Sequence, residues 1–366
     1  MLKVLSVFGT RPEAIKMVPL VLAMNSHPAI DSKVCVTAQH RELLDQVLIP
    51  FNITPDYDLN IMSVGQTLTD ITTKVLQGLA PILADAKPDI LLVHGDTTTT
   101  FAASLAAFYA QVKVGHVEAG LRSYDKYRPF PEEVNRKLTT AIADLYFAPT
   151  AQSRDNLLKE NIPQGRIHVT GNTAIDLVKH TRQEDYTFQC AALNGLDYTK
   201  KIILMTAHRM ENRGEPMENI CRAARRIVQD NPHVELVWPV HPGRAVAEPA
   251  HAILGGVERV LLVEPLGVFD MHNLMARAHL ILTDSGGLQE EAPSFGLPTV
   301  VLREVTERPE GLTAGTLVLA GVAEEDIYHE VTRLLTDEKT YKKMASVPNP
   351  FGDGEASQRI VEAMLG

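Results

Sequence analysis

Acidic side chains follow strand-like segments of this sequence or begin its helices. Asp96 follows the apolar run DILLVHG, Glu118 ends the run KVGHVE, and Glu132 and Glu133 begin a helical pattern in PFPEEVNR. Each acid alone could simply cap a helix or face its dipole. Acids that converge on one site could instead perform acid–base chemistry at a sugar carbon, which needs carboxyl groups approaching from different sides.

Two cations stand near the first strand. Arg11 and Lys16 in FGTRPEAIKMVPL flank the first turn of a helix, and Pro12 suits the first position of that helix. Arg binds a phosphate with a planar fork, and Lys binds it as a point charge. Both could be ordinary surface residues, but their place at the carboxyl end of a strand favours a phosphate site.

Histidines mark strand ends in the second half of the chain. His208 and Arg209 follow KIILMT, and His241 and Arg244 follow VELVWPV in the same way. A single histidine is more often structural than catalytic, although its position at a strand end favours a function. The spacing matches no H-E-x-x-H or other metal signature, so we expect no metal.

The stretch LTDSGGLQEEAPSFG joins a glycine turn to two carboxylates. Ser285, Gly286 and Gly287 follow the strand-like HLILTD and could present a hydroxyl and unpaired amides to a phosphate. Glu290 and Glu291 lie further along the expected helix, where one of them could bind sugar hydroxyls, as an acid binds ribose in dinucleotide domains. Alternatively, these acids serve the helix dipole.

The elements that position these residues alternate between strands and helices. Eleven apolar segments read as strands: KVLSVF, KVCVT, DILLVHG, KVGHVE, LYFAPT, RIHVTG, KIILMT, VELVWPV, VLLVEP, HLILTD and LPTVVL. Helical patterns such as 97–110 and 216–229 separate them, which indicates parallel sheets buried on both faces. We therefore expect an α/β protein with two doubly wound, Rossmann-like domains and an active site in the cleft between them.

A polar, weakly periodic stretch after Gly171 sets the expected boundary. It predicts a first domain over residues 1–171 and a second over 172–355, with a helix at 356–366 crossing back to the first.

Bulk composition narrows the function classes. A net charge of −10 over 366 residues argues against a broad surface for nucleic acid or an anionic membrane. We expect no signal peptide and no membrane-spanning segment, and three scattered cysteines fit a reducing cytoplasm. The first strand is not followed by G-x-G-x-x-G, and no Walker loop occurs, so we expect no cofactor.

Taken together, the motifs resemble one family along the whole chain. FGTRPEAIKM, VHGDTTTTFAASLAAFY, GHVEAGLR, TGNTAID, TAHR, LTDSGGLQEEAPS and TERPEG are similar, in sequence and order, to those of the non-hydrolysing bacterial UDP-N-acetylglucosamine 2-epimerases. The resemblance implies the two-domain GT-B fold and the interconversion of UDP-N-acetylglucosamine (UDP-GlcNAc) and UDP-N-acetylmannosamine (UDP-ManNAc) for cell-surface polysaccharide synthesis.

The resemblance also assigns roles. It implies a catalytic set of Lys16, Asp96, Glu118, Glu132 and His208, and a UDP-binding set of Arg11, Arg136, His241, Met271, Ser285, Gly286, Gly287 and Glu291, with Glu291 on the ribose. A second UDP-GlcNAc is expected as an allosteric activator at Gln39, His40 and Gln66, where Gly65 replaces an arginine of some members. It further implies a homodimer.

The chemistry is consistent with this set. No carbonyl lies beside the C2 proton of the sugar, and a keto route would need a nicotinamide site. The remaining path is an anti elimination of UDP to 2-acetamidoglucal, followed by re-addition after C2 is protonated from the other face. That path needs cations on the diphosphate and carboxylates near an oxocarbenium-like centre.

Three rival functions are weaker. A retaining GT-B glycosyltransferase would need an acceptor groove and need not carry these acids. A hydrolysing 2-epimerase usually has an appended kinase domain, for which 366 residues leave no room. A catalytically inactive nucleotide-sugar sensor would have no reason to keep Asp96, Glu118 and Glu132.

Overall fold

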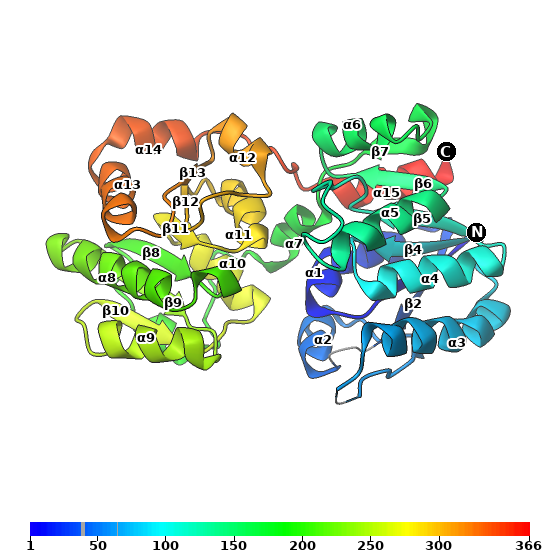
Figure 1. The fold of residues 1–366 in the computed structure, drawn as a ribbon, viewed down its shortest axis with the longest axis horizontal. Coiled ribbons are helices and arrows are strands. Elements are labelled where there is room, and N and C mark those ends of the chain that lie inside the picture. Colours follow the sequence, from blue (N-terminus) through cyan, green and yellow to red (C-terminus); the bar gives the residue numbers. More distant parts are fainter. Residues whose placement is uncertain (38–40, 64) are drawn as a thin grey trace. The chain divides into compact units, whose positions relative to one another are not determined.

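The computed structural model describes residues 1–37, 41–63 and 65–366 (Figure 1). It divides into two compact units: Met1–His180 together with Gly352–Gly366, and Thr181–Phe351. Within the described residues, no helix is both long and apolar enough to cross a bilayer.

The first unit is built on a seven-stranded parallel sheet of order β3-β2-β1-β4-β5-β6-β7. Its strands are β1 (Leu2–Phe8), β2 (Ile30–Val36), β3 (Tyr57–Asp58), β4 (Ile90–His94), β5 (Lys113–Val117), β6 (Leu145–Ala148) and β7 (Ile167–Val169). Every residue of β4 is buried, because helices cover both faces of a doubly wound sheet. The strand order reverses between β1 and β4.

The helices of this unit pack in two rows. They are α1 (Arg11–Asn25), α2 (Arg41–Leu48), α3 (Leu68–Ala86), α4 (Thr98–Tyr109), α5 (Glu132–Ile142), α6 (Ala151–Lys159), α7 (Thr173–Thr181) and α15 (Ala356–Leu365). One row contains α3, α4 and α5, and the other contains α2, α1 and α15. The middle helix α4 is apolar nearly all round because it packs against two helices and the sheet.

The second unit has a six-stranded parallel sheet of order β10-β9-β8-β11-β12-β13. Its strands are β8 (Lys201–Thr206), β9 (Val234–Pro239), β10 (Val260–Val263), β11 (Leu280–Thr283), β12 (Thr299–Val301) and β13 (Leu317–Leu319). Its helices are α8 (Glu215–Asp230), α9 (Arg244–Leu254), α10 (Val268–Met275), α11 (Gly286–Glu291), α12 (Pro309–Ala314), α13 (Glu324–Thr336) and α14 (Glu338–Ala345). Here the strand order reverses between β8 and β11.

The predicted doubly wound α/β class is confirmed in both units. All eleven expected strands are present. Among the described residues, the strands that the sequence analysis missed are β3 and β13, which have two and three residues and lie at sheet edges.

The boundaries differ from the expected ones. The units divide at 180/181 rather than at 171/172, and the segment that returns to the first unit begins at Gly352 rather than at 356. Helix α7 lies in the first unit because its Asp176 carboxylate accepts hydrogen bonds from the backbone N–H groups of Ala356 (3.1 Å) and Ser357 (2.5 Å) at the start of α15. Helix α15 in turn packs against α1.

Candidate functional site

Four of the predicted site residues lie beside the two points where strand order reverses. In the first unit, Arg11 follows β1 and Asp96 follows β4; in the second, His208 follows β8 and Ser285 follows β11. Ligands of doubly wound sheets bind beyond the carboxyl ends of the strands at these points. Each unit therefore presents a candidate half-site.

A buried glutamate joins the two loops of the first half-site. Helix α1 begins with a capping box, in which Thr10 caps the backbone N–H of Glu13 and the Glu13 carboxylate accepts from the N–H of Thr10 at 2.8 Å. The same carboxylate also accepts from Gly9 N–H (3.1 Å) and from the hydroxyls of Thr97 (2.7 Å), the N-cap of α4, and Thr100 (3.4 Å) in its first turn. The turn that carries Arg11 is thus tied to the loop that carries Asp96.

Glu118 lies in a strained position after β5. Its backbone is left-handed, with φ of 63°, which costs a non-glycine residue energy and is typical of functional sites. Its carboxylate forms an ion pair with Lys16 of α1, and His94 Nε2 lies 3.7 Å away. Burial lowers the pKa of His94 to about 3, so this ring stays neutral beside the ion pair.

Asp96 is held by α5. Arg136 donates to the Asp96 carboxylate at 2.5 Å, and Asn135 Nδ2 donates to the Asp96 carbonyl at 2.9 Å. The side chains of Asp96 and Arg136 are 24% and 14% exposed, so the ion pair is accessible to a ligand. The structure therefore brings Asp96 and Arg136 together, as it does Glu118 and Lys16.

The two adjacent glutamates of α5 have different surroundings. Glu133 is fully buried and accepts backbone hydrogen bonds from Ser123 and Tyr124 at 3.0 Å each, so it organises the preceding loop. Glu132 is partly exposed, and its Oε2 is buried without a hydrogen-bond partner among the described residues. Glu133 is thus committed to the loop, whereas Glu132 is the member of the pair that reaches the surface.

In the second half-site, His208 lies next to another histidine and a buried acid. The rings of His208 and His241 stack with centroids 6.1 Å apart, and His208 Nδ1 lies 3.3 Å from Asp284 Oδ1. Burial lowers the pKa of His208, while the negative charge of Asp284 raises it and Arg209 and His241 lower it.

Two guanidinium groups flank the glycine turn after β11. A Cβ placed at Gly286 would lie 3.2 Å from Arg308 Nη2 and 3.8 Å from Arg209 Nη2. Arg308 also pairs with Glu290, which is therefore occupied within the protein. The turn lies beside positive charge, as an anion requires.

The remaining UDP-binding candidates lie on α10 and α11. Glu291 is 12% exposed and accepts from His272 Nε2 at 3.2 Å, while His272 Nδ1 lies 2.6 Å from Thr181 Oγ1. Met271 is partly buried against the apolar core around Leu274. Its exposed part is the only surface that it can offer to a base.

The expected allosteric residues are only partly described. Gln39 and His40 lie outside the described residues. Gln66 accepts hydrogen bonds from the backbone N–H and the hydroxyl of Ser63 at 3.3 and 3.4 Å. Among the described residues, no three His, Cys, Asp or Glu side chains converge as metal ligands would.

The sequence analysis missed four residues that hold the predicted ones in place: Glu13, His94, Asn135 and Asp284. Each has a sequence signal, because each ends a strand or stands within the first turns of a helix next to a predicted site residue. That signal marks their location, but it does not show that their side chains turn inward to bond the neighbouring loops.

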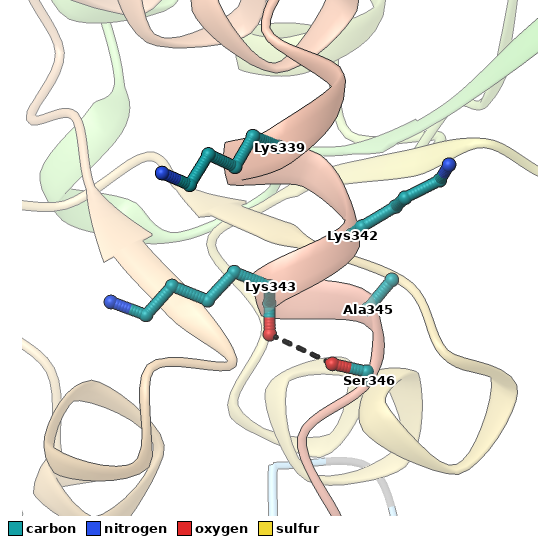
Figure 2. A pocket seen from close by; sticks show the side chains of 5 residues that line it. All are labelled: Lys339, Lys342, Lys343, Ala345 and Ser346. Atoms are coloured by element: carbon teal, nitrogen blue, oxygen red, sulfur yellow. Dashed lines mark hydrogen bonds between the residues drawn. The ribbon is translucent and has the colours of Figure 1, made fainter.

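A lysine-lined hollow on α14 is a different surface from these loops. It is bordered by Lys339, Lys342, Lys343, Ala345 and Ser346, and Figure 2 shows the lysine side chains reaching away from the helix in different directions. Lys342 already pairs with Glu338 at 2.7 Å, with both side chains more than 70% exposed. No predicted site residue borders it.

Comparisons with known proteins show the family to which the chain belongs. The family model described as UDP-N-acetylglucosamine 2-epimerase matches residues 22–365. A Bacillus subtilis (strain 168) protein named UDP-N-acetylglucosamine 2-epimerase is 60% identical over 364 residues, which are 100% of this chain and 95% of that protein.

Two solved structures share the whole fold. The structure of a putative UDP-N-acetylglucosamine 2-epimerase from Listeria monocytogenes has a TM-score of 0.93 at 53% identity, covering 99% of this chain and 95% of that one. The Neisseria meningitidis UDP-GlcNAc 2-epimerase bound to UDP-GlcNAc has a TM-score of 0.89 at 48% identity, covering 100% of both chains. Both units are therefore Rossmann-like domains of this fold, and the chain belongs to the UDP-N-acetylglucosamine 2-epimerase family.

Proposed function

We propose that this protein interconverts UDP-GlcNAc and UDP-ManNAc by eliminating and re-adding UDP. The observation that carries the proposal is the arrangement after β4 and β5, where two carboxylates, Asp96 and Glu118, are each paired with a cation, Arg136 and Lys16. Elimination of a diphosphate requires both kinds of charge, because a carboxylate must remove the C2 proton while cations stabilise the departing diphosphate.

Each step of the proposed reaction balances. A carboxylate removes the C2 proton, the C2–H electron pair forms the C1=C2 double bond, and the C1–O pair leaves with the β-phosphate of UDP. This gives UDP and 2-acetamidoglucal. Protonation of C2 from the opposite face and re-formation of the C1–O bond by UDP give UDP-ManNAc. No electrons are gained or lost overall.

The residues of the first unit supply the acid–base chemistry. Asp96, Glu118 and Glu132 are the proton-exchanging acids, and they also stabilise positive charge that develops at C1. Lys16 and Arg136 are paired with Glu118 and Asp96. A diphosphate that attracts these cations frees both carboxylates to accept a proton from the substrate.

The residues of the second unit bind UDP. Ser285, Gly286 and Gly287 hold the diphosphate. The guanidinium groups of Arg209 and Arg308, which lie close to Gly286, support a site of positive charge there. Glu291, presented by His272, accepts hydrogen bonds from the ribose hydroxyls. His208 and His241 contact the phosphates, and Met271 contacts the base. Arg11 of the first unit adds a further guanidinium.

We further propose the regulation and assembly implied by the family resemblance. A second UDP-GlcNAc binds near Gln66 and activates a homodimer, and the reaction supplies UDP-ManNAc for cell-surface polysaccharides. UDP-ManNAc offered alone should then show a lag that a trace of UDP-GlcNAc abolishes. Linear progress from the first turnover would contradict the activation, and a monomer in light scattering would contradict the dimer.

Product analysis and positional isotope exchange test the chemistry together. UDP-GlcNAc carrying ¹⁸O in the C1–O–P bridge should yield UDP-ManNAc, with the label scrambled among the β-phosphate oxygens of recovered substrate. Free N-acetylmannosamine would indicate a hydrolysing enzyme, and a label that stays in the bridge would exclude C1–O cleavage. Asp96→Asn should abolish turnover. Its matched control is Asp89→Asn, which should keep full activity because the exposed Asp89 lies at the opposite end of β4.

A further inference from the structure

Asp284 is a fully buried acid whose two oxygens have different tasks. It follows β11 and has no exposed surface. Its Oδ2 accepts three hydrogen bonds, from the backbone N–H groups of His208 and Arg209 at 2.8 Å each and from Asn212 Nδ2 at 3.0 Å. This oxygen fixes the turn after β8 to the end of β11.

The other oxygen lies beside the His208 ring. Oδ1 is buried and accepts no hydrogen bond from any described residue, and it lies 3.3 Å from His208 Nδ1. A buried carboxylate oxygen without a donor is costly, whereas a small rotation of the imidazole would give it one. If Asp284 served only the backbone turn, an uncharged asparagine would satisfy the same three donors with its amide oxygen.

We propose that Asp284 is a positioning residue for His208. Its Oδ1 accepts a hydrogen bond from the Nδ1–H group of His208, and this bond orients the ring so that Nε2 points outward for contact with a ligand. The role assigned to His208 rests on the proposed function, whereas its orientation by Asp284 does not. With Nδ1 protonated, the neutral ring presents an acceptor at Nε2, and the imidazolium presents a donor there. A diphosphate can accept from Nε2 only in the charged form, which the Asp284 carboxylate stabilises.

The charges around His208 set its response to a ligand. Asp284 faces it from the end of β11, Arg209 from the same turn, and His241 from the loop after β9. Burial, Arg209 and His241 lower the pKa of His208, and only Asp284 raises it. Binding of UDP adds further negative charge, so we expect it to raise the pKa of His208 in the wild type.

Ring-¹³C-labelled histidine read by NMR tests the proposal without any assay of activity. The His208 signal is assigned by its loss in His208→Gln. In the wild type, the neutral ring should show the Nδ1–H tautomer in its ¹³Cδ2 shift. In Asp284→Asn, whose amide would place an NH₂ group near Nδ1, the ring should switch to Nε2–H and its pKa should fall.

Asn212→Ala is the matched control. It removes one donor to Asp284 Oδ2 and one bond to the Leu302 carbonyl, so it should lower stability while leaving the His208 tautomer and pKa unchanged. In activity assays, Asp284→Asn should lower kcat about 100-fold with a much smaller change in KM. Asn212→Ala should show neither effect.

Two results would overturn the proposal. One is an Nε2–H tautomer in the wild type, which decides the question even if Asp284→Asn fails to fold. The other is an unchanged tautomer and pKa in a folded Asp284→Asn. Absence of epimerase activity would instead reject the proposed function and leave the NMR result standing.

Discussion

Removal of the Glu13 carboxylate should loosen the first half-site more than any single surface contact. The side chain is 2% exposed and accepts four hydrogen bonds, two from the backbone before α1 and two from threonines at the start of α4, Thr97 and Thr100. Burial raises the pKa of Glu13, and the hydrogen bonds from Thr97, Thr10 and Gly9 oppose that shift.

The expected cost follows from the donors left behind. In Glu13→Ala the N–H groups of Gly9 and Thr10 lose their acceptor, and an unsatisfied buried donor costs about 1–3 kcal/mol each. The free energy of unfolding of the first unit should therefore fall by about 4 kcal/mol. Glu13→Gln keeps an oxygen for the two N–H groups and offers its NH₂ to the hydroxyls, so it should lose about 1 kcal/mol.

The assay must separate the two units. Trp238, the only tryptophan, lies in the second unit, so its fluorescence follows that unit during urea unfolding, while far-UV circular dichroism follows both. Glu13→Ala should lower the midpoint of the circular dichroism transition and speed hydrogen exchange in α1 and α4, with the tryptophan transition unchanged. A loss below about 1 kcal/mol in Glu13→Ala would refute the idea that Glu13 ties the two loops.

Three further predictions concern the first unit. Burial lowers the pKa of His94 from 6.5 to about 3 and the pKa of His116 from 6.5 to about 4. Because the unfolded state therefore binds more protons, the stability that these neutral rings contribute is complete above pH 6.5 and is lost as the pH falls towards 4. Each histidine should lower the free energy of unfolding by about 2 kcal/mol between pH 8 and pH 5. Equal urea midpoints at these two pH values would contradict this prediction. Gly120→Ala should destabilise by more than about 3 kcal/mol in the same assay, because its φ is +91° and the new Cβ would lie 2.2 Å from the Ser153 carbonyl oxygen; a milder loss would contradict the close approach. Asp96→Asn should keep UDP affinity in calorimetry while abolishing turnover, and an active variant would remove Asp96 from the mechanism.

The sheet architecture was predictable from the sequence because buried parallel strands are continuous apolar runs. That pattern also located Asp96 and Glu118 at strand ends, since a strand that ends at His94 or Val117 leaves the next residues at its carboxyl edge. The short edge strands β3 and β13 were not predictable, because two or three residues carry no periodicity.

The contacts within the half-sites were not predictable from the sequence. Lys16 and Glu118 are 102 residues apart, and Asp96 and Arg136 are 40 apart, so their pairing depends on how α1 and α5 pack on the sheet. The acid after β11 shows the same limit. The sequence places Asp284 at a strand end, but only the fold shows that it turns inward to His208 rather than outward to a ligand.

Solvent deuterium at C2 of the sugar tests the central claim most directly. In deuterated water, elimination and re-addition should place deuterium at C2 of the UDP-ManNAc formed and, because the reaction is reversible, in the UDP-GlcNAc recovered. Asp89→Asn should label both sugars as the wild type does, and Asp96→Asn should label neither. Conversion by the wild type without deuterium at C2 in either sugar would contradict the account.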